Sequence, residues 1–527
     1  MLARSVALKV FAMLVLVLLL TSCVHLPPER AADLEIGAVR RKPPEAWAPT
    51  EEGPLECNVE QAVLLALENN TSFRVERMDP AIRQTFADEE RAAFDPTLRA
   101  RATASRERTE QESQFFGGTE DLTVSETGVS ASISRRLPTG TNVAVDASTS
   151  RVFENGDFTQ RDRHSARLGL TVTQALLRGY GTDVNLANLR QEQLQTRASE
   201  YELRAAAESL VASVEATCWD YALARRRIEI FTESLNVARQ QLAETKERIR
   251  LGRVAESEQA AAMSEVALRQ EELINARSDL AKTRLKLLRL VNPQAAGMWE
   301  REISLANKPE IPDVQLDEVE PHVQLALRMR PELNQARLDA RRGELEVVKT
   351  KNGLLPKMDV FVQLGKSGYA DSFTGALGDT ENDSYDALAG VDVEFPFGNR
   401  APRARYRRAT RSHARALAAV SNLEQTVQVD VRSAYIEVQR AREQVTATAA
   451  TRNHREESLR AEREKFRVGK STSFLVARAQ RDLVESEIAQ VEARVNYLKA
   501  LIDLYRLEGS LLERRGINAP GREPVEF

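Results

Sequence analysis

Two long helical tracts, each interrupted at one glycine, constrain this chain more than any other feature. Residues 183–250 and 403–467 read as unbroken helix over 68 and 65 residues. At about 1.5 Å per residue, each tract is roughly 100 Å long. The first tract then reads "RIRLGRVAES", with Gly252, and the second reads "FRVGKSTS", with Gly469. Because glycine readily adopts the left-handed conformation of a tight turn, we expect each tract to reverse there and return as a hairpin.

The returning helix of the second hairpin has the pattern of a coiled coil. Its apolar residues are spaced alternately four and three apart: Val484, Ile488, Val491, Val495, Leu498, Ile502 and Tyr505. A seam that recurs every 3.5 residues packs against a neighbouring helix. Since a hairpin this long buries little surface on its own, we expect the two hairpins to need neighbours.

Two other segments alternate between apolar and polar residues with period two. Residues 97–175 contain four such stretches, and residues 356–397 contain two. In "LAGVDVEFPF", for example, Val391 and Val393 fall on one face and Asp392 on the other. This is a strand pattern. The predicted fold class is therefore α+β, with long coiled-coil hairpins and β-strands.

The order helix, strands, helix–glycine–helix occurs twice, which indicates an internal duplication. Cys218-Trp219 in the first repeat corresponds to Ala434-Tyr435 in the second. We divide the chain into a signal peptide (1–22), an N-terminal linker (23–54), a first repeat (55–291), an equatorial linker (292–321), a second repeat (322–509) and a loose C-terminal tail (510–527). The first repeat has an outer helix at about 58–93, strands at about 97–175 and the hairpin 183–290. The second repeat has an outer helix at 322–352, strands at about 356–397 and the hairpin 403–507.

The first 25 residues have the composition of an export signal. Arg4 and Lys9 precede an apolar run that ends at Leu20 and is too short to span a membrane comfortably. Leu20-Thr21-Ser22-Cys23 resembles the bacterial lipobox, which makes Cys23 the predicted lipidation site and anchors the chain to a leaflet. An ordinary signal peptide with a chance cysteine is the alternative. Cys57 and Cys218 lack framework spacing, so free thiols are favoured over a disulfide.

The alternating strands allow two interpretations. Apolar residues on one side and polar residues on the other fit a membrane-spanning barrel, but also a soluble sandwich. The export signal and the length of the hairpins favour the barrel. Lipid requires a closed sheet, and two or four strands per repeat cannot close one. We therefore expect several subunits to pool their strands.

Patterns typical of catalysis are missing from the sequence. The five histidines are scattered without metal-ligand spacing, and there is no phosphate loop or nucleophile elbow. We expect no enzyme activity, no metal and no cofactor. The 74 basic and 78 acidic residues are interspersed, so no nucleic-acid partner is expected. Two functions stay open: a passive transport conduit, or a periplasmic coiled-coil scaffold lipoprotein without a channel.

Taken together, these features resemble the TolC-like outer membrane efflux proteins. The resemblance rests on "VEQAVLLALENN", "LTVTQALLRGYG", "LALRMRPELNQARLDA", "VEFPFGNR" and the two glycine tips, in the family's order and twice over. The lipobox matches the acylated branch of the family. The resemblance implies a lipid-anchored homotrimer in the outer membrane, with four strands per subunit in one shared barrel and a periplasmic helical tunnel. It also implies a periplasmic adaptor (membrane fusion) protein and an inner-membrane pump or ABC transporter, serving efflux or type I secretion.

The sequence departs from that family in the number of strand patterns. Four patterns lie between residues 97 and 175, where the family would have two. One interpretation is that each subunit contributes six strands. The other is that the additional residues only prolong or decorate the usual four.

We expect the hairpin tips to dock the adaptor and to close the entrance, with plain turns as the alternative. The candidate residues are Arg250, Leu251, Gly252, Arg253, Phe466, Arg467, Val468, Gly469, Lys470, Ser471, Thr472 and Ser473. Some relatives carry acidic residues six and nine positions after the second tip glycine, but Leu475 and Arg478 stand there. The role of Glu258, six positions after the first tip glycine, stays open.

The turns from strand to helix form a second set of candidates. They are Gln174 and Ala175 in the first repeat, and Pro396 and Gly398 in the second. Relatives usually have proline in this turn. Pro396 keeps that feature, and Ala175 departs from it.

Overall fold

The structure, a computed structural model, describes residues 54–112, 119–155, 160–252, 254–292, 298–307, 309–312 and 316–525. The predicted signal peptide and lipidation site Cys23 lie outside these residues, as does the tip residue Arg253. The chain divides into two compact units. Of the described residues, the first unit holds 82–196 and 339–416, and the second holds the remainder.

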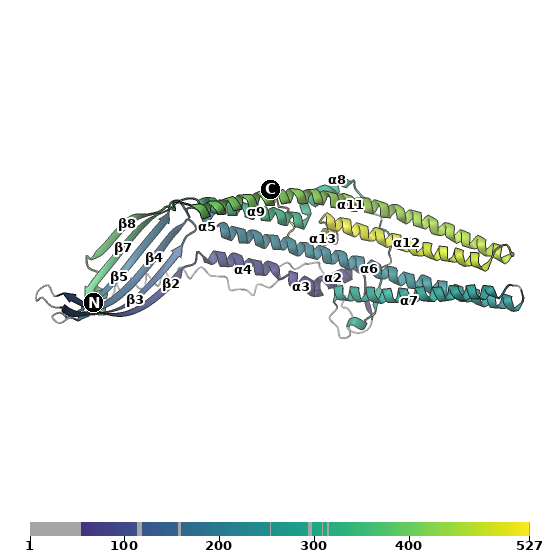
Figure 1. Ribbon diagram of the computed structural model, residues 1–527, viewed down its shortest axis with the longest axis horizontal. Coiled ribbons are helices and arrows are strands. Elements are labelled where there is room, and N and C mark those ends of the chain that lie inside the picture. The colour runs from purple at the N-terminus through teal and green to yellow at the C-terminus, as the bar shows by residue number, and fades with distance from the viewer. Residues whose placement is uncertain are drawn as a thin grey trace. The chain divides into compact units, whose positions relative to one another are not determined.

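The first unit is built on a six-stranded antiparallel sheet in the order β2-β3-β4-β5-β7-β8 (Figure 1). The strands are β2 (Thr97–Glu112), β3 (Thr119–Arg136), β4 (Thr141–Asn155), β5 (Gln160–Ala175), β7 (Lys357–Ala370) and β8 (Tyr385–Glu394). All six predicted patterns are strands. The sheet of one subunit therefore contains six strands, as the first of the two interpretations expects, where the family resemblance implies four.

The register of the sheet separates an apolar face from a polar one. One row of partners across all six strands reads Leu98, Ile133, Val145, Leu170, Leu364 and Ala387. The next row, on the opposite face, reads Arg99, Ser132, Asp146, Gly169, Gly365 and Asp386. Because side chains alternate along each strand, this register keeps the apolar residues of both repeats on one side.

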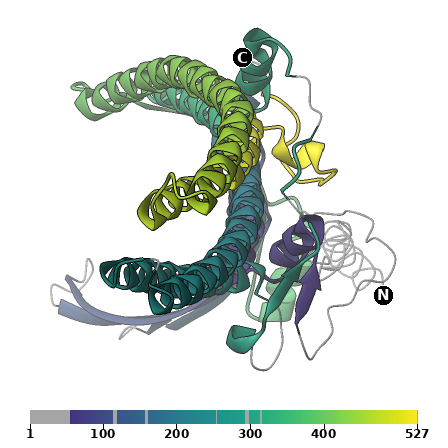
Figure 2. The same ribbon diagram turned by 90° about the vertical axis from the view of Figure 1, so that its right-hand side faces the viewer.

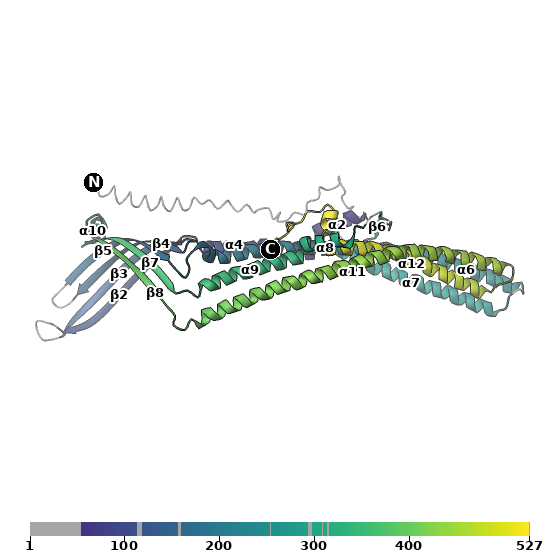
Figure 3. The ribbon, with the colours of Figure 1, turned by 90° about the horizontal axis from the view of Figure 1, so that it is seen from above.

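A short helix, α10 (Phe373–Asp379), lies in the segment between β7 and β8. It packs against β7 and β5 (Figure 3). The Ser372 side chain caps the helix by accepting from the backbone amide of Gly375. Two glycines, Gly375 and Gly378, lower its helix propensity, so the sequence pattern did not reveal it.

Both outer helices are broken where one helix was predicted. The stretch 58–93 forms α2 (Val59–Asn69), α3 (Thr71–Glu76) and α4 (Asp79–Ala92), and 322–352 forms α8 (Val319–Met329) and α9 (Pro331–Asn352). Pro331 explains the second break, because the residue before a proline is driven out of helical geometry. Arg330 accordingly has ψ of 122°. At the first break, the Asn70 side chain accepts from the Phe73 amide and caps α3.

The predicted hairpins are present. The first consists of α6 (Ala187–Arg250), after the short α5 (Thr182–Asn185), and α7 (Ser257–Val291); the second consists of α11 (Arg400–Arg467) and α12 (Ser473–Leu507). The parts of these helices that belong to the second unit lie side by side in a curved row (Figure 2). The coiled-coil seam is confirmed, since Val484, Val495, Leu498, Ile502 and Tyr505 are buried and the other two seam residues, Ile488 and Val491, are half-buried. No helix of the described segments combines the length and apolar character needed to span a membrane.

The described part of the linker contains short regular elements, and the C-terminal tail is more ordered than we expected. Strands β1 (Leu55–Cys57) and β6 (Ile303–Leu305) pair in parallel, and the turn η1 (Met298–Glu300) precedes β6. The prediction of a loose C-terminal tail is wrong. Helix α13 (Leu511–Arg514) buries Leu511 and Leu512 completely, and the last described residue, Val525, is buried too. Packing onto the helices therefore orders a segment that has little periodicity of its own.

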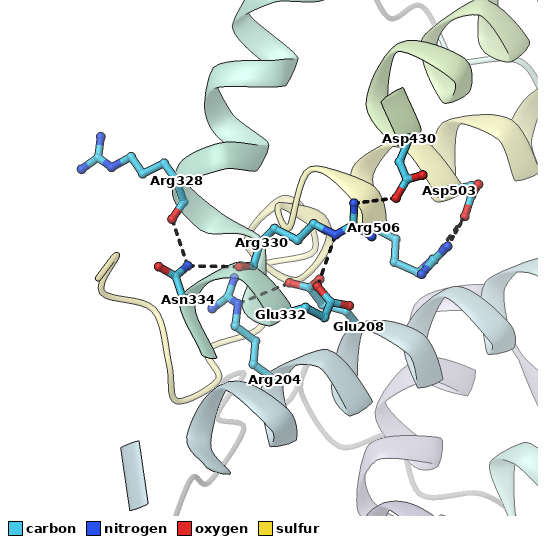
Figure 4. Close-up of polar contacts among 9 residues, drawn as sticks. All are labelled: Arg204, Glu208, Arg328, Arg330, Glu332, Asn334, Asp430, Asp503 and Arg506. Atoms are coloured by element: carbon cyan, nitrogen blue, oxygen red, sulfur yellow. Dashed lines mark hydrogen bonds and ion pairs between the residues drawn. The ribbon is translucent and has the colours of Figure 1, made fainter. Parts of the chain in front are cut away.

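A belt of charged residues fixes the same region of the second unit (Figure 4). Arg330 reaches Asp430 at 2.9 Å and Glu332 at 3.3 Å. Asn334 donates to the backbone carbonyls of Arg328 and Arg330, at 3.0 and 3.1 Å. Arg506 pairs with Asp503 at 2.7 Å. These contacts join α8, α9 and α11 through paired rather than isolated charges.

Arg204 and Glu208 of α6 are the most deeply buried members of this belt. The Arg204 Nε atom lies 3.3 Å from Glu208 Oε1, and both side chains are almost inaccessible. Arg204 also pairs with Glu513 and donates to the Gly509 carbonyl at 3.2 Å. Burial raises the pKa of the Glu208 carboxyl to about 8.

Cys57 and Cys218 are free, as expected, and both are buried. Burial raises the pKa of the Cys57 thiol to about 11 and raises that of Cys218 as well. Both thiols therefore stay protonated at neutral pH and are poor nucleophiles.

Candidate functional site: the hairpin tips and the sheet faces

Each hairpin ends its outgoing helix with the glycine geometry expected from the sequence. Gly252 and Gly469 have φ of 71° and 76°, in the left-handed region. At the second tip, the Gly469 amide donates to the Phe466 carbonyl at 3.1 Å and the Lys470 amide to the Lys465 carbonyl at 2.8 Å. These two bonds are the Schellman pattern that closes a helix C-terminus. The prediction that the glycines are turn residues is confirmed.

The residues after the second glycine start the returning helix. The Thr472 side chain accepts from the Leu475 amide and caps α12. Ser471 binds Glu462 of α11, and its hydroxyl together with Lys465 lowers the pKa of that carboxyl. The tip is thus a well-bonded turn.

The two tips contact one another through side chains. The Arg248 guanidinium lies 4.6 Å from the centre of the Phe466 ring. The Ser473 hydroxyl donates to Glu258, which gives the latter residue a tip-to-tip contact. Farther from the tips, Arg481 lies 3.8 Å from Glu265. Sequence reasoning did not single out Arg248, Glu265 or Arg481, because no local pattern shows that the hairpins lie side by side.

The other tip arginines pair within their own helices. Arg250 bonds to Glu247, and Arg467 lies 2.9 Å from Glu464. The Arg250 contact lowers the pKa of the Glu247 carboxyl. The tips also present apolar side chains outward: Leu251 and Val468, each directly before a tip glycine, are 52% and 60% exposed.

A groove of about 660 Å³ lies between the hairpins just behind the tips. Its lining combines apolar and charged side chains, among them Val237, Arg248, Leu268, Phe466 and Phe474. Phe474 is 57% exposed. The groove and the exposed apolar tips together form a surface suited to a protein helix or loop.

The polar face of the sheet carries a cluster of charges. Arg167 of β5 reaches Asp146 of β4 at 3.1 Å and Asp386 of β8 at 2.7 Å. Gly169 and Gly365 flank this arginine, and a Cβ atom on either would lie within 2.8 Å of its guanidinium. The two glycines therefore leave space for the Arg167 side chain, which links β5 to β4 and β8. The link to β8 reaches across β7, which lies between β5 and β8.

The apolar face, by contrast, is open in the single chain. Leu98, Val129, Leu364, Val391 and Val393 are exposed there, Leu98 at 69%. Two phenylalanines, Phe395 and Phe397, extend beyond β8 and are exposed too. A soluble sandwich would cover such a face with a second sheet, but every long strand among the described residues belongs to this one.

The strand-to-helix turns lie where the sequence placed them. Ala175 is the last residue of β5, and Gln174 accepts from the Thr141 hydroxyl at 2.5 Å and donates to the Ala175 carbonyl at 2.7 Å. Pro396 and Gly398 stand between β8 and α11. The turn without proline is therefore fixed by side-chain hydrogen bonds.

Comparisons with known proteins agree with this geometry. The profile of the outer membrane efflux protein family matches residues 322–510. No curated protein sequence matches the chain.

Several solved structures share the fold. A membrane protein from Pseudomonas aeruginosa is 20% identical, with a TM-score of 0.63 over 89% of this chain and 98% of that one. The CmeC outer membrane channel of Campylobacter jejuni is 14% identical, with a TM-score of 0.63 over 89% and 87%. The open state of the MtrE outer membrane channel of Neisseria gonorrhoeae is 17% identical, with a TM-score of 0.59 over 86% and 89%.

The resemblance drawn from the sequence is confirmed: residues 322–510 match the outer membrane efflux protein family, and the described fold is shared with solved outer membrane channels.

Proposed function

We propose that this protein is the outer membrane channel of a tripartite efflux or type I secretion system. It forms a passive duct from the periplasm to the exterior, and no chemistry occurs on the substrate. The observation that carries this proposal is the exposed apolar face that runs across all six strands, with polar residues behind it. Lipid outside and water inside satisfy both faces of such a sheet.

The sheet needs further copies to close. Its order starts at β2 and ends at β8, and these two edge strands do not pair with each other in the described chain. Open edges are not tolerated in lipid, because their backbone groups would lack hydrogen-bond partners. A homotrimer would close the sheet with 18 strands, six from each copy.

The remaining parts of the chain fit the same assembly. The tips and the groove between the hairpins offer exposed apolar and charged groups to a periplasmic adaptor, and through it to an inner-membrane pump or ABC transporter. Lipidation at Cys23 would add a membrane anchor next to the barrel.

Conductance of purified protein in planar bilayers tests the channel directly. A duct should give stable single-channel currents and a detergent-resistant oligomer. A monomer that lipase treatment releases from membranes, and that never conducts, would instead support the scaffold lipoprotein.

The docking role of the tips has its own test. Lys470→Glu and Arg253→Glu should reduce pump-dependent efflux without reducing the amount of oligomer. Lys286→Glu serves as the matched control, because Lys286 is exposed, as Lys470 is, but lies in α7 far from the tips. Efflux at the wild-type rate in both tip variants would show that the tips are plain turns.

A further inference from the structure

The two edge strands carry charges that their own sheet leaves unmatched. On β8, the Asp392 carboxylate stands directly opposite Asp359 of β7. Asp359 has a partner in Lys357, at 3.3 Å. No hydrogen bond or ion pair reaches the exposed Asp392 carboxylate from the described residues. Like charges directly opposite each other destabilise a sheet. A positively charged side chain on a strand that pairs with the free edge of β8 would therefore stabilise Asp392.

The other edge offers such cations. On β2, Arg99 and Arg101 stand on the same polar face as Asp392, opposite Ser132 and Ser130 of β3. Both arginines are exposed, and neither has an ion pair within the described chain. They lie near the start of β2, whereas Asp392 and Glu394 lie at the end of β8. In an antiparallel pair those two ends come together.

We propose that β8 of one copy pairs with β2 of the next, so that Asp392 faces Arg101 and Glu394 faces Arg99. This inference rests on the proposed multi-copy channel and specifies its joint. In this register all ten residues of β8 find partners inside β2, from Arg99 to Arg108. Val391 and Val393 then face Ala102 and Ala100, so the apolar side stays continuous from one copy to the next.

Two other contacts bear on this register. Glu394 already lies 3.8 Å from Arg178, so Asp392 is the more dependent of the two acids. The register also sets Asp386 opposite Glu107. Asp386 is held by Arg167 at 2.7 Å, which neutralises it inside its own copy. The contact between the two copies therefore gains two ion pairs. It also contains one pair of like charges, Asp386 and Glu107, but the charge of Asp386 is already neutralised by Arg167.

The helices that adjoin the joint have the same complementarity. Beyond β8, the first turns of α11 carry the exposed arginines Arg400, Arg403 and Arg407, and no acidic residue occurs between Glu394 and Glu424. Just before β2, α4 ends with Glu89 and Glu90, which have no partner within the described residues. Pairing β8 with β2 of the next copy would bring these opposite charges toward each other.

A charge swap in the full-length chain tests the joint. Asp392→Lys and Arg101→Glu should each lower the yield of detergent-resistant oligomer by about fivefold, since each change is repeated at every joint. The double variant should restore the yield. Glu126→Lys is the control, because Glu126 is exposed on the same polar face but belongs to the interior strand β3. It should leave the yield unchanged.

Cysteine cross-linking tests the register. Arg101→Cys with Asp392→Cys should form a disulfide between copies, whereas Arg99→Cys with Asp392→Cys should not. The native Cys57 and Cys218 are buried and do not compete. Single variants at the wild-type yield, a double variant without rescue, or cross-linking only through position 99 would each overturn the joint. Wild-type protein that neither oligomerises nor conducts would overturn the channel itself, so the two failures are distinguishable.

Discussion

The two repeats agree in their helices and differ in their strands. Helices α6 and α7 have 64 and 35 residues, and α11 and α12 have 68 and 35. The first repeat nevertheless supplies four strands to the sheet and the second only two. The hairpins stand side by side and touch at their tips, so a change in the length of one would leave the other without a neighbour. A strand hairpin at the edge only widens the sheet, so strand number is free to vary.

The largest expected effect comes from a charge on the apolar face that both repeats share. Leu170 of the first repeat and Leu364 of the second are direct cross-strand partners. Leu170→Arg and Leu364→Arg should therefore be equally damaging, at about 2–4 kcal/mol for an arginine at the bilayer midplane. The measurement is the fraction of protein recovered as membrane-inserted oligomer.

Gln363→Arg is the control for this experiment. Gln363 is the neighbour of Leu364 in β7 and points to the polar face. If Gln363→Arg proved as harmful as Leu364→Arg, the assignment of the two faces to lipid and water would be wrong.

A deletion tests whether the additional strands belong to the barrel. Strand β2 begins and β3 ends at the same end of the sheet, because Thr97 stands opposite Ser134. Residues 97–136, which comprise β2 and β3, can therefore be deleted and the two chain ends joined, because these ends lie close together. The variant then has four strands per copy. Barrel diameter grows roughly linearly with strand number, so conductance should fall to about half. The oligomer should also dissociate more easily, since Arg99 and Arg101 are lost with β2.

Shortening only the connection at 113–118 is the matched control and should leave conductance unchanged. A full-length level of conductance after removal of 97–136 would mean that β2 and β3 decorate the barrel from outside and do not line it.

Much of this fold follows from periodicity. Glycine breaks, the 3.5-residue seam and alternation with period two are local signals, and each of them predicted its element. What the sequence left unclear depends on packing. Helix α10 contains two glycines and forms because β7 and β5 provide a surface for it. The C-terminal segment has no strong period, and its order comes from contacts such as Arg204 with Glu513.

For the candidate site, the sequence predicted the tip residues but not the contacts between the two tips. The tip residues around Gly252 and Gly469 could be named because a glycine within a long helix is conspicuous. Contacts between the tips, such as Arg248 with Phe466, required knowledge of which hairpin faces meet. No pattern within either repeat contains that information.

The smallest expected effect concerns a pair of equivalent glutamates in the two repeats. With Cys218 aligned to Ala434, Glu208 of α6 corresponds to Glu424 of α11. The Glu208 side chain is 3% exposed, whereas Glu424 is 37% exposed and reaches Arg337 at 3.1 Å. The difference arises because Gly509 and Glu513, from the segment after α12, both bind Arg204 beside Glu208.

Burial raises the pKa of Glu208 from 4.5 to about 8, so the folded chain keeps a proton that the unfolded chain releases. Stability from this group is complete below pH 4.5 and is lost as pH rises toward 8. Glu208→Gln should remove that loss and stabilise the helical unit at pH 8 by at least about 1 kcal/mol, as measured by thermal unfolding or proteolysis. Glu424→Gln should leave the pH profile unchanged. An unaltered profile in Glu208→Gln would mean that Arg204 keeps Glu208 ionised, and that the two repeats differ there in packing but not in protonation.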